Sequence, residues 1–273
     1  MSVAARNERV LAPTGERFDA RAFVPVGGGP GVLLLQEIFG FDEFLESRAR
    51  LLASLGYSVL VPDVFWRVER NVTLGHDEAA LQVAFGYMGR FSEIPKDVTT
   101  ADLVAALAHL RSLPETIGKV AVVGYCLGGR LAYEVAAASG PTASGPTASG
   151  PDASGPDACG PDACGPDACG PDACGPDACV SYYGSGIAAE LDLAERIACP
   201  ALFHFGGSDP YLSREEIDAI TAAFAGRPGT EVVVQEHAGH AFENSFAPMF
   251  SNPEAAAASW PVTLAFLDRT LRP

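Results

Sequence analysis

A cysteine lies at a position in the sequence that is suited to nucleophilic chemistry. Residues 124–129 read Gly-Tyr-Cys-Leu-Gly-Gly, between an apolar run and an expected helix. This is the G-x-S-x-G pattern of a strand-to-helix turn, with Cys126 in place of serine. The turn needs small residues on both sides, and the helix behind it directs its N-terminal N–H groups at the sulfur. Taken alone, the motif also fits a small buried cysteine in a glycine-rich turn.

An acid and a histidine follow Cys126 in the order that such a nucleophile requires. Asp209 comes shortly after the apolar run 201–205, and His240 comes after the run 231–234. Asp209 would orient an imidazole and fix its tautomer, while His240 would shuttle the proton. His237 is an alternative base, and spacing does not choose between the two histidines.

The other three histidines have structural interpretations. His204 lies within an expected strand and is predicted to belong to the core. His109 falls on an expected helix, and His76 lies in a polar loop.

A carboxylate and two backbone N–H groups complete the expected chemistry. Glu37 directly follows residues 32–36, at the end of an expected strand. This places it at the same edge of a sheet as Cys126, where it could accept the thiol proton. Alternatively, Glu37 is an ordinary glutamate in a solvated loop. Ile38 N–H and Leu127 N–H are the natural pair to stabilise an oxyanion, one from each flanking loop.

The elements that must position these residues follow one another as strand and helix. Such alternation predicts an α/β fold with a mostly parallel sheet, helices on both faces and an N-terminal β-hairpin over residues 9–26. The glycines at 27–31 precede a strand, so they do not form a phosphate loop, which must follow one. Strands are expected at 32–35, 58–61, 119–123, 180–183, 201–205 and 231–234. Helices are expected from a cap at Asp42 to about Leu55, and at about 77–90, 97–113, 127–138, 188–197, 213–225 and 255–271.

A five-residue repeat interrupts this pattern from about 139 to 179. It repeats Ser-Gly-Pro-Thr-Ala and then Cys-Gly-Pro-Asp-Ala, a composition that cannot build a packed element of its own. We therefore predict one domain over residues 1–273, interrupted by a repeat loop. The cysteine spacing lacks the paired short steps of zinc sites, so no metal is expected.

Composition excludes several other classes of function. The 18 Lys and Arg against 34 Asp and Glu, a formal charge of −16, disfavour a nucleic-acid or anionic membrane partner. No apolar run reaches the about 20 residues of a membrane span, and the N-terminus has no signal core. The seven cysteines show no disulfide pattern, so a cytoplasmic protein is expected.

The chain resembles the dienelactone hydrolase family, the carboxymethylenebutenolidases. The matching stretches are residues 36–40 (QEIFG), 124–129 (GYCLGG), 182–184 (YYG), 200–204 (PALFH) and 238–242 (AGHAF). The resemblance implies an α/β-hydrolase fold, Cys126 as nucleophile, His240 as base and Asp209 as its orienter. It also implies that Glu37 keeps the thiol protonated until substrate arrives. No cofactor is implied.

The chain departs from the family at the two arginines that bind the substrate carboxylate. The position four residues after the catalytic histidine is Asn244, and residues 72–84 contain no arginine. Arg67 or Arg90 is a candidate replacement, and Phe39, Trp66 and Tyr87 are candidate pocket walls that fit the core equally well. A lost Arg–carboxylate pair would weaken recognition of an anionic substrate.

The sequence therefore predicts a hydrolase that cleaves a small activated ester or lactone through an acyl-thioester on Cys126. Thiolate leaves more easily than an amine or a simple alkoxide, which favours enol lactones and aryl esters over peptides. The alternatives are a non-catalytic binding protein with the same fold and a scaffold whose repeat recruits partners. The oligomeric state is not predicted.

Overall fold

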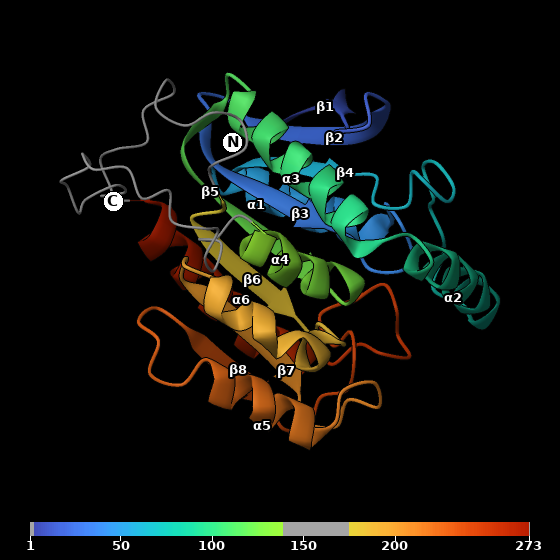
Figure 1. Cartoon of the computed structure of the whole chain (residues 1–273), viewed down its shortest axis with the longest axis vertical. Helices are drawn as coiled ribbons and strands as arrows, with labels where there is room; N and C mark the ends of the chain where they lie inside the picture. Colours follow the sequence, from blue (N-terminus) through green and yellow to red (C-terminus); the bar gives the residue numbers. More distant parts are fainter. Residues whose placement is uncertain (1–2, 139–174, 273) are drawn as a thin grey trace, which may run out of the picture.

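An eight-stranded sheet forms the centre of the computed structural model, which describes residues 3–138 and 175–272 (Figure 1). The strand order is β1-β2-β4-β3-β5-β6-β7-β8. The pairs β1–β2 and β2–β4 are antiparallel, and all other neighbours are parallel. The strands are β1 (Val3–Leu11), β2 (Arg17–Pro25), β3 (Gly29–Leu35), β4 (Ser58–Pro62), β5 (Thr116–Tyr125), β6 (Ala178–Tyr182), β7 (Ala201–Gly206) and β8 (Glu231–Gln235).

Helices cover both faces of the sheet, as the alternating pattern predicts (Figure 1). The helices are α1 (Glu43–Ser54), α2 (Glu78–Ser92), α3 (Lys96–Ser112), α4 (Leu127–Ala138), the 3₁₀ segment η1 (Ile187–Arg196), α5 (Arg214–Ala223) and α6 (Pro253–Leu271). One apolar core lies between the sheet and α3, α4, η1 and α5. A second core lies between the opposite face and α1 and α6. The expected α/β-hydrolase architecture with an N-terminal hairpin is confirmed.

Most predicted boundaries agree with the structure within a few residues. Asp42 caps α1 as expected, because its carboxylate accepts the Leu45 N–H at 2.8 Å. The segment expected as a helix at 188–197 is instead a 3₁₀ segment with a kink at Glu190. Among the described residues, no helix is both long and apolar enough to cross a bilayer.

The end of the repeat belongs to the sheet and not to a loop. Ala178 and Cys179 open β6, both are completely buried, and Cys179 pairs with Val122 and Ala201 on the two neighbouring strands. The predicted loop boundary at 179 is therefore too late by two residues. Residues 139–174, with the remaining repeat cysteines, lie outside the described residues, so the rest of that prediction stays a prediction.

The register of the sheet brings the candidate residues to one edge. Leu35 of β3 pairs with Gly124 of β5, so Glu37 and Cys126 each follow two residues later. Gly206 of β7 pairs with Gln235 of β8, and Asp209 and His240 lie in the loops beyond these strands. The carboxyl ends of parallel strands are where open α/β sheets place their sites.

Candidate active site

Cys126 occupies a strained turn between β5 and α4. Its φ is +55°, a left-handed backbone conformation that is unusual outside glycine. A Cβ atom on Gly124 would lie 1.9 Å from the Gly128 carbonyl oxygen, and one on Gly128 would lie 2.5 Å from the Leu35 carbonyl oxygen. Both motif glycines are therefore needed for the close approach of β5, α4 and β3. The Cys126 N–H donates to the Tyr182 carbonyl at 3.0 Å, which holds the turn in place.

His240 lies between Cys126 and Asp209. Its Nδ1 is 2.7 Å from Asp209 Oδ2, and its side chain is hydrogen bonded to Cys126. Burial lowers the pKa of His240, but the charge of Cys126 and the hydrogen bonds with Asp209 and Cys126 outweigh burial and raise it above its ordinary value. His240 is therefore placed to hold a proton beside Cys126. The alternative base His237 is exposed.

Two aromatic rings and one backbone group fix this pair. The Tyr183 and Tyr211 ring centroids each lie 5.1 Å from that of His240. The Tyr211 N–H donates to Asp209 Oδ1 at 2.8 Å, so the carboxylate presents its other oxygen to the histidine. The imidazole therefore has little freedom to turn away from Cys126.

Glu37 is a buried carboxylate and not a solvated loop residue. It is 2% exposed, and it accepts hydrogen bonds from Asn244 Nδ2 at 2.7 Å and Tyr183 Oη at 3.2 Å. Burial and the nearby charge of Asp42 raise the pKa of Glu37 to about 7, against the opposing effects of Asn244, His240 and Tyr183. Glu37 can therefore exchange a proton near neutral pH.

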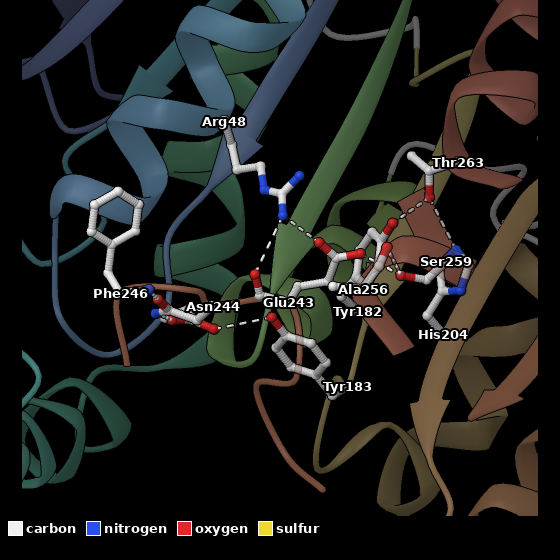
Figure 2. A network of polar contacts seen from close by, with 11 residues as sticks. Arg48, Tyr182, Tyr183, His204, Glu243, Asn244, Phe246, Ala256, Ser259 and Thr263 are labelled. Atoms are coloured by element: carbon white, nitrogen blue, oxygen red, sulfur yellow. Dashed lines mark hydrogen bonds and ion pairs between the residues drawn. The ribbon is translucent and has the colours of Figure 1, made fainter. Parts of the chain in front are cut away.

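A second polar group supports the segment that carries Asn244. Figure 2 shows Arg48, from α1, directed at Glu243, with Asn244 and Tyr183 beside them. Arg48 Nη2 donates to the Glu243 carbonyl at 3.3 Å and forms an ion pair with the Glu243 carboxylate, which also accepts from Ser259. Pairing and hydrogen bonding stabilise the charges of this buried pair.

A small apolar cavity of about 70 Å³ opens onto Cys126. Its wall combines the candidate catalytic residues with side chains from α2 and from the loops that follow β3, β6, β7 and β8. The lining residues are Glu37, Ile38, Phe39, Leu81, Phe85, Met88, Cys126, Ser185, Tyr211, His240, Ala241 and Phe250. Among the described residues, no lysine or arginine lines this cavity.

Comparison with known proteins decides the family. The sequence pattern of the dienelactone hydrolase family matches residues 18–148 and 172–271. The chain belongs to this family. It is 33% identical over 259 residues to the carboxymethylenebutenolidase of Pseudomonas sp. (strain P51), covering 94% of this chain and 92% of that protein. It is 29% identical to carboxymethylenebutenolidase 1 of Cupriavidus pinatubonensis, covering 92% and 91% of the two chains.

Solved structures agree in fold. A dienelactone hydrolase-like promiscuous phosphotriesterase, P91 from metagenomic libraries, superposes with a TM-score of 0.70 at 23% identity, covering 98% of this chain and 99% of that one. A dienelactone hydrolase from Anabaena variabilis gives a TM-score of 0.63 at 15% identity, with both chains fully covered. The protein is thus an ester or lactone hydrolase by family.

The candidate substrate contacts of this dienelactone hydrolase family member lie in different surroundings. Phe39 lines the cavity, but Trp66 and Arg67 do not. Trp66 stacks on Phe18 with ring centroids 5.2 Å apart. Arg67 is held by Asp102 at 2.6 and 2.9 Å, so neither side chain is free to meet a substrate.

Tyr87 and Asn244 also have roles outside the cavity wall. Tyr87 packs against Phe65, and its helix presents Leu81, Phe85 and Met88 to the cavity instead. Asn244 is completely buried and contacts Glu37. The candidate replacement Arg90 lies over the Tyr87 ring, 4.9 Å from its centroid, and does not line the cavity.

His76 is the polar residue that the sequence interpretation missed. Although it lies in a loop, its Nε2 is 2.8 Å from Asp42 Oδ2 and 3.3 Å from Asn244 Nδ2. A ring nitrogen of His76 and carboxylate oxygens of Glu37 and Asp42 all lie within 4.8 Å of one another. Together with Asn244, these groups form a buried polar network. The local sequence gives no signal for a contact between such distant segments.

The remaining histidines are structural, as predicted. His204 is buried in β7, its Nε2 lies 3.0 Å from Thr263 Oγ1, and burial lowers its pKa to about 3. Nε2 of His109, on α3, lies 3.2 Å from Oε2 of Glu8, on β1. Neither His204 nor His109 lines the cavity.

Proposed function

We propose that this hydrolase cleaves small, neutral, activated esters or lactones through an acyl-thioester on Cys126. The observation that carries the proposal is the connected series Cys126, His240 and Asp209 at the end of a small apolar cavity. A cysteine in a strained turn, bonded to a histidine that an acid orients, has the features of an activated nucleophile.

The first half of the reaction makes the thioester. The Cys126 proton passes to His240, with Glu37 as a second acceptor, and the thiolate attacks the carbonyl carbon. The carbon–sulfur bond forms while the carbonyl π electrons move to oxygen, where Ile38 and Leu127 N–H groups stabilise the charge. The bond to the leaving oxygen then breaks, and His240 returns a proton to that oxygen.

The second half releases the acid. His240 takes a proton from water, and the hydroxide attacks the thioester carbonyl. The carbon–sulfur bond breaks, the acid is released, and the leaving thiolate takes the proton back from His240, which restores the starting state. Asp209 orients His240 and stabilises its charge in both halves.

The cavity wall supports the choice of a neutral substrate. Its side chains are mainly apolar, and its charged groups are Glu37 and, when protonated, His240. An anionic substrate would bring a carboxylate close to Glu37, and the described wall offers no arginine to pair with it. The relatives are named carboxymethylenebutenolidases, and this name supports lactones, beside esters, as substrates.

The test compares dienelactone with a neutral aryl acetate, using Cys126→Ala as the control. We expect turnover of the neutral ester at a much higher kcat/KM than that of the anionic lactone, and a loss of at least about 1000-fold in the variant. Equal turnover of both substrates would contradict the neutral class but keep the nucleophile. Undiminished activity of Cys126→Ala would reject the mechanism.

A further inference from the structure

Glu37 faces a second group of polar side chains. Asn244 lies between Glu37 and this group: its Nδ2 donates to Glu37 Oε2 at 2.7 Å and is 3.3 Å from His76 Nε2. His76 Nε2 is in turn 2.8 Å from Asp42 Oδ2. These residues come from the loop after β3, the loop before α2 and the loop after β8.

The orientation of each partner is fixed by the backbone. The Phe246 N–H donates to Asn244 Oδ1 at 3.0 Å, so the amide must present its NH₂ group to Glu37. The Leu45 N–H donates to Asp42 Oδ1 at 2.8 Å, which leaves the other oxygen for His76. The ring of His76 also packs edge-on against Phe39, with centroids 4.6 Å apart.

The charges of this group favour a cation beside the two carboxylates. Glu37 and Asp42 are 2% and 3% exposed, and their oxygens approach within 4.8 Å, so two ionised carboxylates would repel strongly. A ring nitrogen of His76 lies within 4.8 Å of both carboxylates, so a protonated His76 compensates one of the two negative charges. Burial lowers the pKa of His76, but Asp42 and then Glu37 and Glu43 outweigh burial and raise it. Coupling between two charges is reciprocal, so the imidazolium favours ionised Glu37 to the same extent.

We propose that His76, held by Asp42, is a positioning residue that keeps Glu37 ionised and thereby lets Cys126 lose its proton. The inference rests on the proposed function of Glu37 as an acceptor of the thiol proton. The other titratable groups that face Glu37 are His240 and Tyr183, which belong to the site itself. His76 does not line the cavity and therefore acts through Glu37 and not on substrate.

The test is the pH dependence of Cys126 alkylation by iodoacetamide, followed by mass spectrometry of the peptide that contains Cys126. His76→Gln keeps a hydrogen-bond donor for Asp42 but cannot carry a charge. We expect the midpoint of the alkylation profile to move upward by about one pH unit, because Glu37 stays protonated to higher pH. The acid limb of kcat/KM for a neutral aryl acetate should move by the same amount.

Two further variants make the result specific. His109→Gln removes a partly buried histidine that also pairs with a glutamate but lies far from the cavity, and we expect no shift from it. In a Glu37→Gln background, adding His76→Gln should cause no further shift, because the residue through which it acts is gone.

Two results would overturn the proposal. One is a His76→Gln profile that superimposes on that of the wild type, and the other is a full shift that persists in the Glu37→Gln background. Activity retained by Cys126→Ala would instead reject the proposed mechanism, so the two failures can be told apart.

Discussion

Glu37 is a buried carboxylate whose surroundings oppose its charge. In the unfolded chain its carboxyl group ionises near the ordinary pKa of 4.5, whereas in the folded protein burial and Asp42 raise the pKa to about 7. Between these values the folded protein binds a proton that the unfolded chain releases, so folding stability falls as the pH rises through this window. Above the folded pKa the destabilisation is complete. Glu37 thus lowers stability in the same pH range in which it can accept a proton.

Glu37→Gln should therefore make the protein more stable and less active at pH 8. We expect the free energy of unfolding to rise by about 1–3 kcal/mol at pH 8 and to change little at pH 4, because the charged form is removed. Urea unfolding at both pH values measures the difference. Glu215→Gln, at an exposed glutamate on α5, is the control and should have no such pH dependence. The account would be contradicted if the difference in free energy of unfolding between Glu37→Gln and the wild type were the same at pH 4 and at pH 8.

Substitution of His240 should reduce activity far more than substitution of His237. His240→Ala is expected to reduce kcat/KM for an aryl acetate by about 100- to 10,000-fold, since it removes the general base beside Cys126. His237→Ala should stay close to wild type, because His237 is exposed and does not line the cavity. Steady-state kinetics of both variants checks this. Similar losses from both would mean that the base is wrongly assigned.

At the scale of elements, α2 forms one wall of the cavity. Leu81, Phe85 and Met88 recur at spacings of four and three residues, so they share one face of the helix. Elsewhere this helix is largely exposed or half-buried, and Ala84 and Phe91 are its buried residues. The size of the acyl group should therefore depend on α2.

Phe85→Ala should widen the acyl site. We expect the ratio of kcat/KM for an aryl butyrate to that for the acetate to rise by about tenfold, since two more methylene groups gain apolar contact. Val83→Ala is the matched control on the same helix, because Val83 is 47% exposed and faces away from the cavity. An unchanged ratio in Phe85→Ala would show that α2 does not bound the acyl group.

The elements themselves were largely predictable, because each buried strand is a continuous apolar run followed by a turn signal. The β-strand Ser58–Pro62 and the capped helix after Asp42 are examples. The grouping of Cys126, Asp209 and His240 was also predictable, because each follows a strand of the parallel sheet and they occur in the order nucleophile, acid, base. The contacts of Trp66 and His76 could not be predicted, because they depend on how distant loops pack side chain against side chain.

At the scale of the whole molecule, the middle of the repeat lies between the two segments that match the family pattern. The family pattern matches residues 18–148 and 172–271 and leaves 149–171 unmatched. Helix α4 ends at Ala138 and strand β6 begins at Ala178, so the sheet needs only a connection between them. The buried pairing of Cys179 shows that the last unit of the repeat contributes to the sheet.

Deletion of residues 149–168, four whole repeat units, should leave hydrolysis unchanged. We expect kcat/KM for an aryl acetate within about twofold of the full chain, since the sequence predicts a loop here and loops tolerate changes in length. The same assay on a variant that also lacks residues 175–179 is the contrasting case, and it should fail because β6 loses its first residues. A large loss in the first deletion would contradict the view of the repeat as a passive connection.

The account depends most directly on a covalent intermediate at Cys126. The decisive measurement is the mass of the protein quenched in acid within milliseconds of mixing with an aryl ester, followed by mass analysis of the peptide that contains Cys126. The account predicts an added acyl group on that peptide, which forms before steady state, decays with water and does not appear in Cys126→Ala. Rapid turnover with no acyl group on Cys126, or with the acyl group on another residue, would contradict it.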